Sequence, residues 1–202
     1  MKISDKIKCA SFPCTDISKD NYLVPPADIN AEKIKILMIT EAPPENKADY
    51  FYAAGNPFYL QTTLQTFRDA GENVVSMQDI LNLGVYITTA VKCGKMQYAI
   101  SPETLKNCSA LLEREVALFP NVRAFILGGD VAIKMMNDIW KRQTGKKVIP
   151  SGSTYKIRGQ AYYTGDKRVF PSYTPAGKNF LIEKSKRKMV GEDIGEALKV
   201  IR

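Results

Sequence analysis

Residues 34–44 read IKILMITEAPP, and this stretch decides the fold. The apolar run Ile34–Ile39 has a β-branched bias and is typical of a short buried strand. Two prolines, Pro43 and Pro44, then forbid continuation as either regular element. The stretch therefore predicts a core strand that opens, at its carboxyl end, into the loop Thr40–Pro44.

Strands and helices alternate along the rest of the chain. Residues 60–70 carry apolar side chains at helical spacing, and Ser101-Pro102-Glu103 is a favourable helix start. Such alternation indicates an α/β fold with a mostly parallel sheet. Core strands are expected at 34–39, 85–91, 123–127 and 169–173 (the last broken by Pro171), helices at 60–70, 102–119 and 130–140, and a hairpin arm at 154–164.

The length of 202 residues suits a single domain over residues 1–202. Within it, residues 1–33 are expected to be irregular and residues 177–202 to form a basic helical region. No apolar stretch approaches the roughly 20 residues that a membrane helix needs, and the N-terminus lacks the apolar segment of a signal peptide. We therefore expect a soluble, cytoplasmic protein without membrane association.

The positive charge is concentrated at one end of the chain. The net charge is +8, yet residues 1–140 hold 14 Lys and Arg against 16 Asp and Glu, whereas residues 141–202 hold 15 against 5. A basic segment of this kind is typical of a surface that faces phosphates. An acidic protein partner, or a basic surface that is merely solvated, would give the same pattern.

The chain contains no histidine. This excludes a Ser-His-Asp triad, a His-Glu-x-x-His zinc site and a histidine general base. In a parallel sheet the ligand crevice lies outside the carboxyl ends of the strands. Four segments should meet there and supply any chemistry: 40–44, 88–93, 128–130 and 172–177.

Four cysteines form two pairs that are far apart in sequence: Cys9 with Cys14, and Cys93 with Cys108. Four thiolates that converge can bind a tetrahedral metal ion or an iron–sulfur cluster. Reduced structural cysteines explain the same spacing, and disulfides do so less well without a secretory signal.

Four stretches, in this order, are similar to motifs of one enzyme family. They are residues 36–44 (ILMITEAPP), 55–58 (GNPF), 87–93 (ITTAVKC) and 172–176 (SYTPA). They resemble the Gly-Glu-Ala-Pro-Gly, Gly-x-Pro-Phe, Leu-Thr-Asn-Val-Val-Lys-Cys and Thr-Tyr-His-Pro-Ala motifs of the iron–sulfur uracil-DNA glycosylases of families 4 and 5. The resemblance covers about residues 5–185.

The resemblance implies a three-layer α/β/α fold around a four-stranded, mostly parallel sheet, and a 4Fe-4S cluster on Cys9, Cys14, Cys93 and Cys108. It also implies hydrolysis of the N-glycosidic bond of uracil or another damaged base, in single- or double-stranded DNA, as part of base excision repair. We expect the protein to act as a monomer. The family separates its first two cysteines by two residues, whereas four residues separate Cys9 from Cys14 here.

The resemblance also assigns site residues. A flipped base must be read at its Watson–Crick edge and stacked on an aromatic face. Ala42, Phe58 and Thr89 fall at the base-binding positions. Glu41, Glu45, Asp49 and Thr174 are the candidate catalytic residues, with Glu45 and Asp49 both possible water-positioning groups.

Two departures concern the chemistry itself. Thr174 stands where the family has its leaving-group histidine, and Thr89 stands where it has its uracil-reading asparagine. A hydroxyl carries no positive charge and cannot make the paired contacts of an amide. A glycosylase for another base, or a nucleic-acid-binding protein without catalysis, therefore remain alternatives.

The loop and helix after Thr174 are expected to bind DNA. In the family this loop enters the minor groove, where an apolar side chain can hold the stack open and basic side chains contact phosphates. The candidates are Lys178, Asn179, Phe180, Lys184, Lys186, Arg187 and Lys188.

Overall fold

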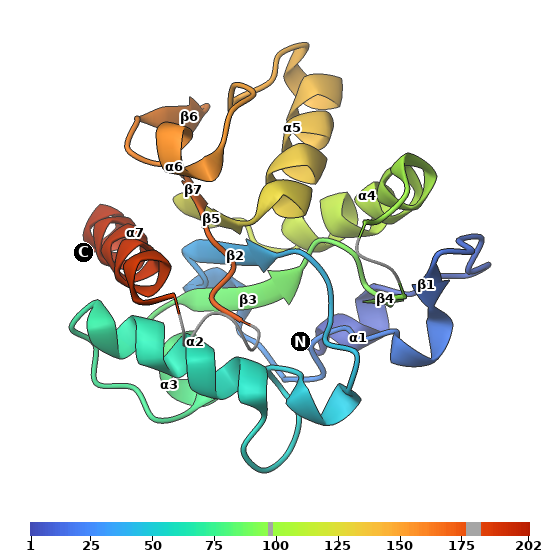
Figure 1. Ribbon diagram of the computed structural model, residues 1–202, viewed down its shortest axis with the longest axis horizontal. Coiled ribbons are helices and arrows are strands. Elements are labelled where there is room, and N and C mark those ends of the chain that lie inside the picture. The colour runs from blue at the N-terminus through green and yellow to red at the C-terminus, as the bar shows by residue number, and fades with distance from the viewer. Residues whose placement is uncertain (97–98, 177–182) are drawn as a thin grey trace.

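A five-stranded sheet forms the centre of the computed structural model, which describes residues 1–96, 99–176 and 183–202 (Figure 1). The strand order is β3-β2-β5-β7-β6. The first four strands are parallel, and β6 pairs antiparallel with β7. The bounds are β2 (Ile36–Thr40), β3 (Val85–Thr89), β5 (Ala124–Gly128), β6 (Tyr162–Thr164) and β7 (Lys167–Ser172).

Strands β2, β3 and β5 carry the core. All five residues of each of β2, β3 and β5 are buried, as expected of parallel strands that are covered on both faces. The four parallel strands are those that the sequence predicts. The sheet differs from the prediction by its fifth strand, β6, which lies inside the segment expected to form an arm.

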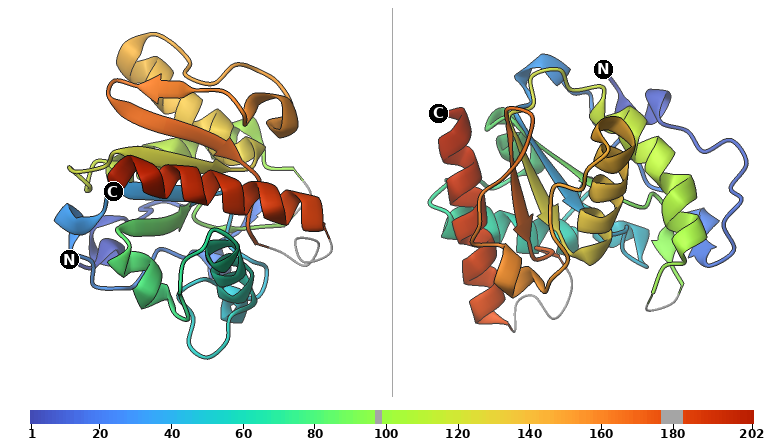
Figure 2. Two further views of the ribbon diagram at one scale, coloured as in Figure 1. Left: turned by 90° about the vertical axis from the view of Figure 1, so that its left-hand side faces the viewer. Right: turned by 90° about the horizontal axis from the view of Figure 1, so that it is seen from above.

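Helices cover both faces of the sheet, so the three-layer α/β/α arrangement is confirmed. Figure 2 shows α7 on one side of the sheet, with α4 and α5 on the other. Helices α2 and α3 share the face of α7, and α2 packs along α7. The bounds are α2 (Phe58–Asp69), α3 (Met77–Asn82), α4 (Pro102–Val116), α5 (Asp130–Thr144) and α7 (Lys184–Ile201).

The N-terminal segment is mostly irregular, as predicted, and hydrogen bonds attach it to the body of the molecule. Strand β1 (Ile17–Ser18) pairs antiparallel with β4 (Gly94–Lys95), which follows Cys93. Asp16 accepts a hydrogen bond from the Ser101 amide at 2.7 Å and another from the Thr104 hydroxyl, at the start of α4. The short elements here are α1 (Ile3–Lys6) and the 3-10 helices η1 (Lys19–Asn21), η2 (Ala31–Lys33) and η3 (Lys47–Asp49).

Two local predictions were wrong. The arm does not alternate throughout, because Thr154–Ile157 forms the short helix α6 before β6 begins. Strand β7 runs through Pro171 without a break. Strand β6 pairs with β7 only as far as Val169, so that side of β7 needs no amide donor at Pro171.

The Arg168 side chain lies at the outer border of the sheet, the edge formed by β6. Its guanidinium donates to the carbonyl oxygens of Tyr162 at 3.0 Å and Gln160 at 3.2 Å. It also lies over the Tyr163 and Phe170 rings, 5.2 and 4.6 Å from their centroids.

In the described ranges, no helix is long and apolar enough to cross a membrane.

Candidate functional site

The carboxyl ends of β2, β5 and β7 meet at Gly129. This residue has φ +98°, and a Cβ built there would lie 2.6 Å from Glu41 Oε1 and 2.8 Å from Thr174 Oγ1. Only glycine combines that backbone conformation with such close neighbours. The segments around residues 40–44, 128–130 and 172–176 therefore converge as predicted, within the residues described.

The Thr174 hydroxyl has no free hydrogen to donate to a ligand in the site. Its hydroxyl donates to the Gly128 carbonyl at 2.8 Å, so its one hydrogen is already committed. Hydrogen bonds from the residues that follow β3 hold the loop that carries Glu41. The amides of Ala90 and Val91 donate to the carbonyls of Thr40 at 2.7 Å and Glu41 at 2.9 Å.

The three predicted base-binding residues differ in exposure. Phe58 opens α2, is half-buried and stands outside the core cluster, as a stacking platform requires. Ala42 is buried after the end of β2. Thr89 is fully buried, and its hydroxyl has no hydrogen-bond partner among the described residues.

A cleft of about 640 Å³ lies beside the first motif. Pro43, Glu45, Tyr59 and Lys95 line it, together with Ser18, Asn21 and Met96. Burial, and then the negative charges of Asp49 and Glu41, raise the pKa of Tyr59. Both predicted water-positioning acids therefore belong to this region: Glu45 lines the cleft, and Asp49 is near enough to act on a tyrosine that lines it.

A buried ion pair supports the floor of the site. Lys92 and Glu115 are paired with side-chain exposures of 0% and 1%. The Lys92 ammonium also donates to Thr88 Oγ1 at 2.9 Å and to the Thr89 carbonyl. Glu115 Oε1 accepts from the Tyr86 hydroxyl at 2.6 Å and from Thr88 at 2.8 Å. This network fixes the end of β3, where Thr89 lies.

The four cysteines line a single cavity of about 290 Å³ between the N-terminal segment and α4. All four are free thiols. The Lys92 amide donates to Cys108 Sγ at 3.3 Å, and the Asn107 side-chain amide approaches Cys14 Sγ at 3.9 Å. Burial, and then the neighbouring thiols, raise the pKa of Cys93 to about 12. Within the described ranges, no three His, Cys, Asp or Glu residues are grouped to hold one metal ion.

The predicted DNA-binding residues that the structure describes lie on the first turns of α7. Lys186 pairs with Glu183 at 2.5 Å, and Arg187 pairs with Asp69 of α2 at 2.8 Å. Lys184 and Lys188 are exposed and form no ion pair with any described residue. Lys178, Asn179 and Phe180 lie outside the described residues.

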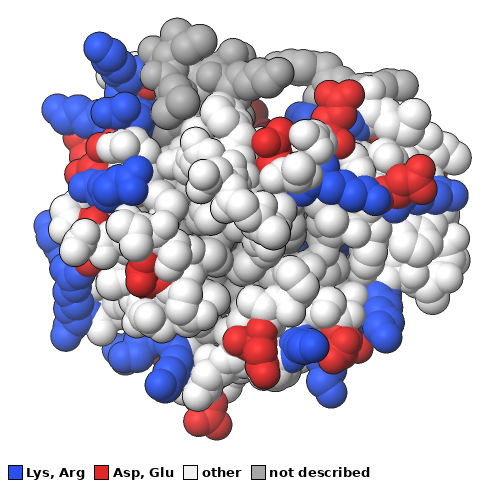
Figure 3. Space-filling model, turned by 90° about the horizontal axis from the view of Figure 1, so that it is seen from below, with Lys and Arg blue, Asp and Glu red and all other residues white. Residues whose placement is uncertain are grey.

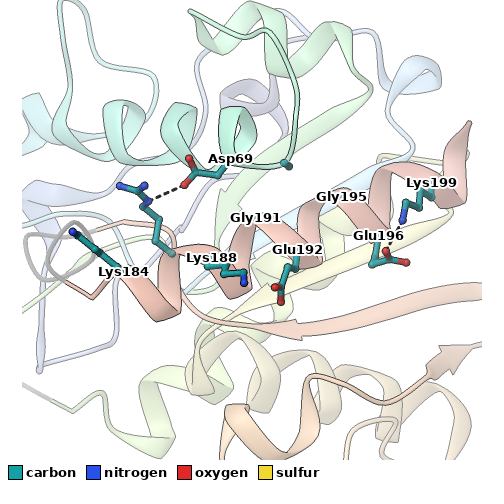
Figure 4. Close-up of a pocket in the computed structure, with 10 residues that line it drawn as sticks. Asp69, Lys184, Lys188, Gly191, Glu192, Gly195, Glu196 and Lys199 are labelled. Atoms are coloured by element: carbon teal, nitrogen blue, oxygen red, sulfur yellow. Dashed lines mark hydrogen bonds and ion pairs between the residues drawn. The ribbon is translucent and has the colours of Figure 1, made fainter.

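Lys184 and Lys188 line an open groove of about 470 Å³ that runs between α2 and α7 (Figure 4). Further along the groove lie two acidic residues, Glu192 and Glu196, and then the basic Lys199. In Figure 3, Lys and Arg side chains gather along the left-hand edge of the molecule, the side on which α7 lies in Figure 1. The basic end of this groove is formed by the first turns of α7.

Sequence reasoning missed three residues of the site: Lys95, Tyr59 and Glu115. Lys95 lies two residues beyond the segment 88–93 that was expected at the carboxyl edge, and that proximity could have indicated it. Tyr59 follows the predicted Phe58. Glu115 gives no signal in sequence, because a glutamate inside an amphipathic helix is usually solvated.

The sequence is similar to that of a known protein family. The family model of the uracil DNA glycosylase superfamily matches residues 26–194. A type-5 uracil-DNA glycosylase of Thermus thermophilus is 26% identical over 100 residues, which cover 50% of this chain and 46% of that protein. The chain therefore aligns with less than half the length of this relative. Since the family model spans most of the sequence and the fold agrees with it, the chain belongs to the uracil DNA glycosylase superfamily.

Proposed function

We propose that the protein is a DNA glycosylase that hydrolyses the bond between a damaged base, uracil in the first instance, and its deoxyribose. The observation that carries this proposal is the meeting of Glu41, Gly129 and Thr174 at the carboxyl edge of the sheet, beside a cleft lined by Glu45 and Tyr59. Membership of the superfamily and the printed name of the Thermus relative support the same reaction.

The chain's own residues would divide the work as follows. Phe58 stacks on the extruded base, and the backbone around Ala42 borders the base's edge. Glu45 holds the attacking water, since it lines the cleft directly. Glu41 orders the loop through Lys95, 3.6 Å away, and through its carbonyl, which accepts from the Val91 amide.

The DNA would lie across the carboxyl edge and the start of α7. Lys184 and Lys188 are exposed at the basic end of the α2–α7 groove, where they can contact phosphates. Such contacts fix the position of the duplex but carry no sequence information. Selection of the damaged base therefore rests with the residues that line the cleft.

Cys9, Cys14, Cys93 and Cys108 would hold the 4Fe-4S cluster. The fit is supported by four free thiols around one cavity and by amide donors at Cys108 and Cys14. A cluster takes one thiolate per iron, so its ligands need not surround a single point as those of a lone metal ion do. When bound, it would supply one-electron redox chemistry and tie the N-terminal segment to α4.

A second function is favoured by one observation. The Thr174 hydroxyl is committed to Gly128, so the position of the family histidine offers no free donor to a departing base. A protein with this fold that binds damaged DNA without cutting it would look the same at that position. Activity measurements separate the two functions.

The test is single-turnover incubation with oligonucleotides that carry uracil or another deaminated base, single- and double-stranded, followed by alkaline cleavage of abasic products. Excision by the natural protein supports the glycosylase. Gly129→Ala is the inactive control, because its Cβ would strike Glu41 and Thr174 without changing any charge. Salt-dependent binding with no abasic product on any substrate would establish the binding protein instead.

The variants Glu45→Gln and Asp49→Asn decide which acid holds water. We expect the larger loss of rate for Glu45→Gln, with DNA affinity unchanged in both.

For the cluster, anaerobic purification with iron and sulfide assays should give about four iron and four sulfide ions per chain if all four cysteines are ligands. Iron-free, colourless protein from that preparation contradicts the cluster but leaves the glycosylase untouched.

A further inference from the structure

The departing base becomes negatively charged, and none of the candidate residues considered so far stabilises that charge. When the C1′–N bond breaks, the electron pair goes to the base, which leaves as an anion. Donors or cations aimed at such a charge supply a large part of enzymatic rate enhancements. The chain has no histidine, and Thr174 donates to Gly128 instead.

Lys95 brings a positive charge to this place. Its ammonium lies 3.6 Å from Glu41 Oε2, while Glu41 Oε1 borders the Gly129 turn next to Thr174. The Lys95 side chain is 36% exposed and lines the cleft together with Glu45 and Tyr59. The Glu41 carboxylate therefore links a cation from β4, at one oxygen, to the turn beside Thr174, at the other.

The backbone holds Lys95 in that position. Lys95 pairs with Ile17 of β1, and Gly94 pairs with Ser18. A Cβ on Gly94 would lie 2.9 Å from the side chain of Asn21, so this ribbon packs closely against η1. Asn21 in turn donates to the Glu45 carbonyl. The N-terminal segment thus positions both Lys95 and the loop of Glu45.

We propose that Lys95 is the catalytic cation that stabilises the departing base, a role that rests on the proposed glycosylase function. Water held by Glu45 adds its oxygen to C1′, and its proton passes to that carboxylate. The electron pair of the broken bond stays on the base, where the Lys95 ammonium lowers its energy. The base takes up a proton from solvent after release. Glu41 is a positioning residue that holds the ammonium.

The experiment compares Lys95→Ala, Lys95→Gln and Lys95→Arg with the natural protein on two substrates, uracil and 5-fluorouracil in the same DNA sequence. Lys95→Ala should slow single-turnover excision of uracil by about 10²–10³-fold, the usual loss for a donor at a developing anion. The loss should be smaller for 5-fluorouracil, whose anion needs less stabilisation. Lys95→Arg keeps the charge and should retain most of the rate, whereas Lys95→Gln should not.

Lys47→Ala is the matched control, because Lys47 is an exposed lysine of η3 near the same loop. It removes one positive charge from the DNA side of the molecule and should leave the excision rate at saturating protein unchanged. DNA affinity and the thermal unfolding midpoint, measured for every variant, show that each one is folded and binds.

Each outcome decides something. Excision by the natural protein with an equal rate in Lys95→Ala overturns the role of Lys95 and leaves the glycosylase standing. An equal loss on uracil and 5-fluorouracil, or a loss confined to DNA affinity, makes Lys95 a DNA-binding residue and overturns the proposal. Failure of the natural protein to excise either base shows that uracil is not its substrate and overturns the role of Lys95 proposed here, whereas the glycosylase itself is decided by the wider set of damaged bases.

Discussion

The lysines of two lysine–glutamate pairs are three residues apart in the chain, yet the two pairs differ greatly in burial. Lys92 and Glu115 are exposed by 0% and 1%, and both also bond to neighbouring hydroxyls. Lys95 and Glu41 are exposed by 36% and 29%, and Lys95 lines a cleft. Neighbouring side chains enclose the Lys92–Glu115 pair, so no ligand can reach it, whereas Lys95 lines a cleft that a ligand can enter. Burial therefore separates a lysine that builds the site from one that can act in it.

The sharpest way to break this comparison is to remove each lysine charge in turn. Lys92→Met should lower the free energy of unfolding by about 3–5 kcal/mol, because Glu115 is left buried and uncompensated. Lys95→Met should lower it by less than about 1 kcal/mol, the usual value of an exposed pair. Urea denaturation of both variants checks this. Equal losses would mean that burial does not distinguish the two pairs.

Removal of both buried charges should restore part of the loss. In Lys92→Met/Glu115→Leu no charge is left uncompensated, but the Tyr86 hydroxyl loses its acceptor at 2.6 Å. An orphaned buried hydroxyl costs about 1–3 kcal/mol, so the double variant should lie between the natural protein and Lys92→Met. The same urea measurement decides, and a double variant no more stable than Lys92→Met contradicts the explanation.

Two lysines of α7 differ in another way, because within the described part of the chain one forms an ion pair and the other does not. Lys188 has no ion-pair partner among the described residues, whereas Lys186 pairs with Glu183 at 2.5 Å. Lys188→Ala should lower the slope of log affinity for DNA against log salt by about 1. Lys186→Ala should change it less, because Glu183 already neutralises part of that charge. Affinity titrations over a range of salt concentrations measure both slopes, and equal changes would contradict the ordering.

The smallest effect concerns the attachment of the N-terminal segment that places Lys95. Burial raises the pKa of Asp16, but hydrogen bonds from Thr104 and Ser101 outweigh it, so the pKa is lowered overall. A lowered pKa in the folded state adds stability above the ordinary value near 3.9, and that stability is lost as the pH falls through the lowered pKa. Asp16→Asn should therefore unfold more easily than the natural protein at neutral pH, with the difference shrinking in acid. Denaturation midpoints at several pH values measure it, and a difference that does not depend on pH contradicts this reading.

The sequence predicted the frame of the molecule well, because apolar runs and prolines act locally. The strand that ends at Thr40, the helix start at Ser101 and the meeting of strand ends at Gly129 all follow from such signals. Strand β6 was missed because three residues carry too short a pattern. Helix α3 was missed although Ser76 and Asp79 form a capping box at its start.

The candidate site was predicted only in part. Glu41 and Thr174 could be placed from their motifs, since both follow core strands. What Thr174 does could not be read, because the Gly128 carbonyl that accepts its hydrogen bond lies 46 residues away. Lys95 depends on the pairing of β4 with β1, a contact between segments almost 80 residues apart that no local pattern announces.

The outer border of the sheet has a consequence for behaviour at high concentration. A strand at the edge of a sheet offers unpaired backbone groups on which another chain can assemble. Here that edge is only the three residues of β6, and the charged Arg168 side chain lies beside it, bonded to the carbonyls of Tyr162 and Gln160. A parallel sheet left open at β7 would have been a template for aggregation. Along this border, the chain instead presents a short, charged edge that discourages fibre growth.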